Sequence, residues 1–181
     1  MGPTSTLRHE HEIILLVLNG IERGAGSLRA TLLDDPDWLD TIVDFVRNFA
    51  DRCHHGKEER HLFPRLEERG IPGAGGPIGV MLQEHEQGRA FIRSVAGAAP
   101  EARAGDTEAM DIASEALLAY VSLLRSHIAK ENDVLFMMAE RVLTPEDQTE
   151  LGAAFDRVEA DEMGEGTHER YHELAHQLGE H

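Results

Sequence analysis

HHGKEERHLF, residues 54–63, has a near copy further along the chain. The segment HIAKENDVLF, residues 127–136, repeats its His, Lys, Glu, Leu and Phe at the same offsets, 73 residues later. Both segments place polar residues first and apolar residues last, and neither shows the alternating β-branched pattern of a strand. We therefore expect two helices that carry the same polar groups at corresponding positions.

A second pair of matching segments accompanies the first. The tripeptide EHE stands at residues 10–12 and again at residues 84–86, an offset of 74. Because the two offsets nearly agree, we interpret residues 1–70 and 71–140 as two copies of one helical hairpin. Each copy offers a histidine on its first helix and a His-x-x-x-Glu pair on its second.

The helical pattern extends over almost the whole chain. We predict an all-α fold: an antiparallel four-helix bundle over residues 1–143, built from two helical hairpins, and a short C-terminal helical extension over residues 144–181. Residues 97–106 are expected to form a loop. Caps, prolines and apolar periodicity predict the helices, which cover residues 6–23, 35–70, 77–96, 107–143, a segment opening at TPEDQ (144–148) and the segment HERYHELAHQL (168–178).

Composition limits the function classes. The chain has 181 residues, of which 41% are apolar, so it can form one domain with a sizeable core. It carries 34 acidic and 17 basic residues, a net charge of −17, and nucleic acid and anionic membranes are therefore not expected partners. We expect neither a transmembrane helix nor a signal peptide, and the single cysteine, Cys53, fits a reducing compartment. The sequence thus predicts a cytoplasmic protein.

Several polar side chains fall on helix faces that the apolar periodicity assigns to the core. His11 and His85 lie on the apolar stripes of their helices, as does Glu131, with His127 one turn before it. Burying an imidazole or carboxylate without a partner costs on the order of several kcal/mol. A metal is the simplest shared partner, because residues i and i+4 lie on one helix face and a carboxylate can bridge two ions.

The second predicted helix leaves two alternatives open. Its apolar phase favours His55 with Glu59, whereas the repeat selects His54 with Glu58. We follow the repeat, since a distortion near the site or at the proline that follows could rotate the phase. His55, Glu59 and His61 remain as alternates or as groups that orient the ligands.

With these residues the chain resembles the hemerythrin-like, HHE cation-binding family over about residues 5–140. The two EHE segments, HHGKEERHLFP and HIAKENDVLF together, in this order and spacing, are a fairly specific motif. The resemblance implies a four-helix bundle with a non-heme di-iron centre in which Glu58 and Glu131 bridge the ions. Carried over by position, the metal ligands are His11, His54, Glu58, His85, His127 and Glu131.

The sequence departs from the oxygen-carrying hemerythrins on two helices. Those proteins have His-x-x-x-His on the third helix, where this chain has Met81 in place of the first histidine. They have His-x-x-x-x-Asp on the fourth, where this chain has Asn132, with Glu131 one residue earlier. The expected centre therefore has four histidines instead of five and is more nearly symmetric. Because reversible oxygen transport relies on one saturated and one open iron, we expect a member that senses or processes oxygen, peroxide, nitric oxide or iron.

The expected cofactor is two iron ions, with manganese or zinc as alternatives for a mixed nitrogen and oxygen ligand set. The predicted function is to bind or react with a small oxidant (O2, peroxide or NO) at a carboxylate-bridged centre in the bundle core. The alternative is a metal storage or structural metal-binding interaction module without turnover. Whether the protein is an enzyme, and which protein partner it has, stays open; no nucleotide-binding loop, Ser/His/Asp set or other catalytic group is found.

Two features of the C-terminal segment have alternative interpretations. The acidic stretch FDRVEADEMGEG, residues 155–166, is either a lid over the site or solvated surface. The histidines at 168, 172 and 176 share one helix face and either bind a surface metal or face solvent.

Overall fold

The computed structural model describes residues 2–164 and 167–180, and no strand occurs within these ranges. The predicted all-α class is confirmed. Long α-helices alternate with short π-helical segments, labelled η. In chain order the elements are α1 (Pro3–Gly26), α2 (Leu28–Asp34), α3 (Trp38–Phe45), η1 (Val46–His55), η2 (Glu58–Leu62), α4 (Phe63–Glu68), α5 (Pro77–Arg103), α6 (Thr107–Lys130), η3 (Glu131–Leu135), α7 (Phe136–Val142), α8 (Pro145–Val158), η4 (Glu159–Met163) and α9 (Thr167–Glu180).

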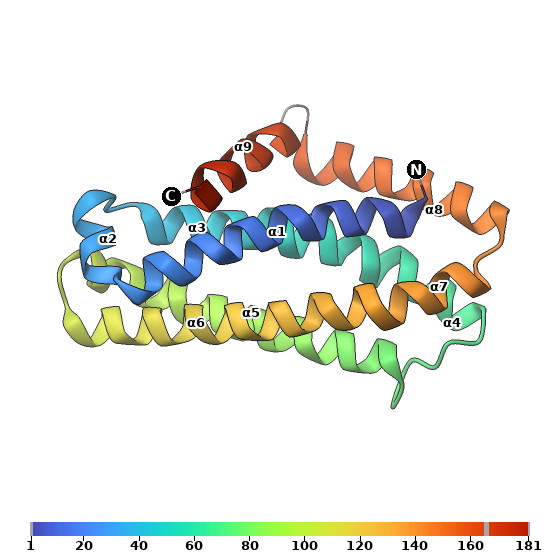
Figure 1. The fold of residues 1–181 in the computed structure, drawn as a ribbon, viewed down its shortest axis with the longest axis horizontal. Helices are drawn as coiled ribbons and strands as arrows, with labels where there is room; N and C mark the ends of the chain where they lie inside the picture. Colours follow the sequence, from blue (N-terminus) through green and yellow to red (C-terminus); the bar gives the residue numbers. More distant parts are fainter. Residues whose placement is uncertain (1, 165–166, 181) are drawn as a thin grey trace.

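The long helical stretches lie side by side along the length of the molecule (Figure 1). α1, the stretch from α3 to α4, α5, and the stretch from α6 to α7 follow one another in alternating directions. α5 packs against α6, α6 packs against α1, and α5 also contacts α3. Their inner faces enclose the core.

Two apolar clusters make up this core, and polar residues separate them. On α1, Leu7 belongs to the smaller cluster and Ile14 to the larger one, and the buried His11 lies between them. The same order holds on α5, where His85 is buried between residues of the two clusters. The centre of the molecule is therefore a polar layer enclosed at both ends by apolar side chains.

The third long helix is longer than the sequence predicted. Residues 97–106 were expected to form a loop, but α5 continues through most of them to Arg103. Alanine has the highest helix propensity, and Ala98, Ala99 and Ala102 are buried against the core, so the alanine-rich segment stays helical around Pro100. The helix ends before Gly105, whose φ of 96° few other residues adopt.

The connection between the first two long stretches also differs from the prediction. It contains the short helix α2, which buries Leu28 and Leu32 and was not predicted. The following helix α3 begins at Trp38 and not beside Asp35, because the Asp35 side chain accepts a hydrogen bond from the backbone N–H of Asp37 at 3.1 Å in a turn.

The C-terminal segment packs against the outside of the long stretches (Figure 1). Its first helix, α8, begins as predicted, with a capping box between Thr144 and Asp147. Asp147 also accepts hydrogen bonds from Arg65 and Arg69 near α4. The last helix, α9, lies along α1. In the described part of the chain, no helix combines the length and apolar character needed to cross a membrane.

Candidate metal centre

The two His-x-x-x-Glu segments lie where the helices depart from α-helical winding. η1 ends at His55 and η2 begins at Glu58, while η3 begins at Glu131. A π-helical turn holds more residues than an α-helical turn, and such turns are frequent at functional sites. In η1 the wider turn lets His54 and His55, which are neighbours in sequence, both point into the core, where each is nearly fully buried.

The structure therefore brings together both of the alternatives that the sequence left open. His54 and Glu58, favoured by the repeat, face the centre, and so does His55. Glu59 points to the outside of the centre and binds His85, while His61 is not part of the cluster. Five histidines are buried in this cluster, one more than the four expected.

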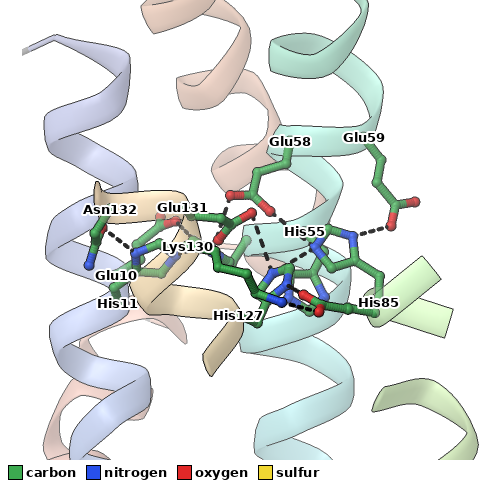
Figure 2. Close-up of polar contacts among 12 residues, drawn as sticks. Glu10, His11, His55, Glu58, Glu59, His85, His127, Lys130, Glu131 and Asn132 are labelled. Atoms are coloured by element: carbon green, nitrogen blue, oxygen red, sulfur yellow. Dashed lines mark hydrogen bonds and ion pairs between the residues drawn. The ribbon is translucent and has the colours of Figure 1, made fainter. Parts of the chain in front are cut away.

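The donor atoms form two groups that share one carboxylate (Figure 2). Within each group the donor atoms lie within 4.8 Å of one another. All the members are buried. The first group is His11, His54, Glu58 and Glu131, and the second is His55, Glu58, His85 and His127. All six residues expected from the sequence are thus found in one place, joined by His55.

Both carboxylates lie between the two groups. Glu131 places one oxygen 3.1 Å from Nε2 of His11 and the other 3.3 Å from Nε2 of His127. Glu58 places one oxygen 3.6 Å from Nε2 of His54 and the other 3.4 Å from Nε2 of His85. Each carboxylate therefore faces two histidines, one from each group. This is the arrangement needed to bridge two cations.

Seven of the inward-facing atoms make no hydrogen bond. They include both side-chain oxygens of Glu58 and of Glu131, and Nε2 of His11, His54 and His55. Buried polar atoms in folded proteins almost always have a partner, and leaving one without it costs about 1–3 kcal/mol. Seven such atoms around one point fit a pair of metal ions.

Nε2 of His85 and Nε2 of His127 face one another at 3.1 Å. The other ring nitrogen, Nδ1, donates to Glu59 in His85 and to Glu84 in His127. When both rings are neutral, both Nε2 atoms carry lone pairs, so a cation between them would stabilise this contact.

Carboxylates and one amide around the centre fix the orientation of the five rings. Nδ1 of His54 donates to Glu10 at 2.8 Å, and Nδ1 of His127 donates to Glu84 at 2.9 Å. The remaining three pairs are His11 with Asn132 at 2.9 Å, His55 with Asp51 at 3.3 Å and His85 with Glu59 at 2.7 Å. Each ring therefore presents Nε2 to the centre, as metal-binding histidines do when an outer acceptor holds Nδ1.

Two of these outer carboxylates are held by lysines at corresponding positions of the repeat. Lys57 donates to Glu10, and Lys130 donates to Glu84. Lys57 is completely buried and also donates to Glu159 of η4 at 2.6 Å. The acidic stretch that begins at residue 155 therefore reaches the outer layer of the centre through Glu159; residues 165 and 166 lie outside the described residues.

Burial and neighbouring charges set the protonation of the site. Burial lowers the pKa of His54 to about 4 and that of His55 well below its usual value, so both rings are neutral, the form that binds metal. Burial raises the pKa of Glu58 well above its usual value, and repulsion from Glu131 adds to this effect. Burial alone would raise the pKa of Glu131, but His127 and His11 lower it well below its usual value. Without cations, Glu58 therefore favours the protonated form and Glu131 the ionised form. Bound cations would allow both carboxylates to be ionised.

The C-terminal histidines lie apart from this centre. Nε2 of His172 on α9 is 3.4 Å from Nε2 of His9 on α1, on the surface. The rings of His172 and His176 are 5.7 Å apart. The side chain of the histidine at 168 lies outside the described residues.

Two features of the centre were not predicted from the sequence. His55 was considered only as an alternate, and the conflict between the apolar phase and the repeat was the one sign of its role. Asp51 lies one turn before His55, an i, i+4 pair that could have been noticed.

The hemerythrin HHE cation binding domain matches residues 2–139. The chain belongs to this family. The match covers the helices that carry the five histidines and both carboxylates, so the clustered donors lie within the part of the chain that defines the family.

Relatives of this hemerythrin-type chain come from bacteria. The uncharacterized protein Rv1995 of Mycobacterium tuberculosis is 26% identical over 159 residues, which are 88% of this chain and 62% of that protein. The iron-sulfur cluster repair protein DnrN of Neisseria gonorrhoeae is 38% identical over 89 residues, which are 46% of this chain and 54% of DnrN. The chain thus spans less than two thirds of these relatives, and no solved structure gave a significant match.

Proposed function

We propose that this chain is a non-heme di-iron protein that binds or reacts with a small oxidant, O2, peroxide or NO, at a carboxylate-bridged centre in the core of an antiparallel four-helix bundle. The observation that carries the proposal is that two buried carboxylates each face both histidine groups while their oxygens lack hydrogen-bond partners. The proposed ligands are His11, His54, His55, Glu58, His85, His127 and Glu131. Bound iron would supply the redox chemistry.

The protein itself supplies a fixed and water-poor environment. The outer acceptors hold each Nδ1 proton, so the rings cannot turn away from the centre. The apolar clusters on either side exclude water and lower the local dielectric constant, which strengthens the attraction between the carboxylates and a cation. These residues would thus hold the metal before any oxidant arrives.

Iron is favoured over manganese and zinc by the family and by one relative. DnrN is named as an iron-sulfur cluster repair protein, and its similarity to this chain supports iron handling as a second candidate function. In that case the centre stores or passes on iron without turnover, the alternative that the sequence also left open. A cytoplasmic location stays a prediction.

Metal analysis and optical spectroscopy of freshly purified protein test the proposal. We expect two iron ions per chain and near-ultraviolet charge-transfer absorption that changes on addition of peroxide, dithionite or NO. Iron that is released readily and whose spectrum does not respond to these reagents would favour storage or delivery. A colourless protein that holds zinc would contradict the proposed redox function.

A further inference from the structure

A cavity of about 160 Å³ lies beside the second histidine group. His55 and His85 form part of its wall, so the cavity is next to the proposed metal ligands. Its other walls come from η1, α5 and α6 and include Arg47, Asp51, Arg89, Arg93 and Tyr120.

The hydroxyl of Tyr120 lacks a partner in this wall. Tyr120 is only 2% exposed, and its hydroxyl makes no hydrogen bond. Burial raises the pKa of Tyr120, so the hydroxyl keeps its proton and can donate. A buried donor that borders a cavity is most stable when a molecule in the cavity accepts its hydrogen bond.

The charge of the cavity wall is opposite to that of the protein. Three arginines line it, Arg47, Arg89 and Arg93, against one carboxylate, Asp51. Arg89 pairs with Asp51 and with two more carboxylates beside the wall, so the excess positive charge comes from Arg47 and Arg93. The chain as a whole carries a net charge of −17. A small anion that is repelled by most of the surface would therefore be attracted at this point.

Arg89 connects the cavity to the centre. Its guanidinium donates to Asp51 at 2.8 Å, to Glu59 at 2.7 Å and to Glu86 at 2.6 Å. Asp51 accepts from Nδ1 of His55, and Glu59 accepts from Nδ1 of His85. An anion near Arg89 would compete with these carboxylates for the guanidinium and would change the hydrogen bonds that orient both rings.

We propose that this cavity binds a small oxyanion, which accepts the hydrogen bond of the Tyr120 hydroxyl and lies in the positive field of Arg47 and Arg93, and that its binding modulates the metal centre through Arg89. The inference rests on the proposed function and deepens it, because it adds a regulatory ligand to the same site. The recognised chemistry is a compact, singly charged anion with oxygen acceptors, of the size of nitrate, nitrite or formate.

Calorimetric titration of the metal-loaded protein with nitrate, in buffer of low chloride content, tests this proposal. We expect one nitrate per chain, and at least tenfold weaker binding to Tyr120→Phe. Tyr171→Phe is the matched control, because the Tyr171 hydroxyl donates to Asp44 away from the cavity, and it should bind nitrate like the wild type. Arg93→Gln, which removes one positive charge at an exposed position of the wall, should weaken binding several-fold.

Metal content and the near-ultraviolet spectrum are recorded on the same samples. Tyr120→Phe should keep the full metal content, and saturating nitrate should shift the spectrum of the wild type but not that of Tyr120→Phe at the same concentration.

Absence of nitrate binding, or equal binding to wild type and Tyr120→Phe, would overturn the proposal without affecting the proposed metal centre. Nitrate binding that disappears with the metal but not with the Tyr120 hydroxyl would also overturn it, since the anion would then bind the metal. A protein without iron that still binds nitrate through Tyr120 would refute the proposed function and the modulation of an iron centre, and would support the anion site itself.

Discussion

The two hairpins share three inner residues each, His11, His54 and Glu58 in the first and His85, His127 and Glu131 in the second, but differ around them. In both, a lysine and a histidine bind one outer glutamate: Lys57 and His54 bind Glu10, and Lys130 and His127 bind Glu84. The repeat therefore reproduces the part of the site that holds one histidine of each group.

Three polar residues occur in only one of the two copies. His55, Asp51 and Arg89 correspond in the repeat to Ile128, Leu124 and Leu15, which are apolar and pack in or against the larger core cluster. The first group thus has two histidines, and the second has three with an ionic network behind them. The duplicated hairpin thus supplies the two carboxylates that lie between the groups, while local substitutions make the two donor groups unequal.

Removing either carboxylate should have the largest effect on the centre. Because Glu58 and Glu131 each face both histidine groups, Glu58→Ala or Glu131→Ala should lower the metal content from two ions per chain to nearly none. Elemental analysis of the purified variants measures this. Variants that each keep two ions would show that neither carboxylate bridges.

Making the two hairpins alike should affect one metal position. His55→Ile copies the residue at position 128, so the second group keeps two histidines and should lose its ion first, leaving about one ion per chain at limiting metal. His54→Ile should instead empty the first group. Competition with a chelator, followed by elemental analysis, measures both. Equal loss of both ions in the two variants would contradict unequal positions.

Removing the outer glutamates should weaken metal binding by about 10–100-fold, the usual effect of losing the acceptor behind a ligating histidine. Glu10→Gln and Glu84→Gln should weaken it to a similar extent, because each accepts from one histidine and one lysine. Glu10→Gln should lower thermal stability more, since Lys57 is completely buried whereas the Lys130 side chain is 40% exposed. Metal titration and thermal melts test this pair, and a greater loss of stability in Glu84→Gln would contradict the reasoning.

The smallest effect is expected for Arg89→Gln. The substitution frees Asp51 and Glu59 without removing either acceptor, so it should weaken metal binding by less than about tenfold, and only in the second group. Leu15→Gln changes the corresponding position of the first hairpin and serves as the control, with no effect on metal affinity. An equal effect of Arg89→Gln on both metal positions would show that the network is not confined to one half.

The sequence predicted the repeated parts of this molecule well and the unrepeated parts poorly. The repeat and the apolar stripes placed His11, Glu58 and Glu131 in the core without knowledge of the fold. The same reasoning missed His55, because in a regular α-helix two adjacent residues point about 100° apart, so only one of His54 and His55 was expected at the centre. The π-helical turn of η1 narrows this angle, and helix propensities contain no information about such a turn.

Some helix ends were predicted correctly from the sequence and others were not. Thr144 and Pro145 gave the start of α8 correctly, since capping boxes depend on residues next to one another. The end of α5 was placed too early, because burial of the alanines against the core maintains the helix past Gly97, and tertiary contacts are not visible locally.

X-ray absorption at the iron edge of the purified wild-type protein is the most direct test of the central claim, that two shared carboxylates hold a pair of ions. We predict two irons per chain, with a metal–metal distance of about 3.5–4 Å and mixed nitrogen and oxygen ligands. A single iron per chain, or two irons without a metal–metal contribution to the spectrum, would contradict it.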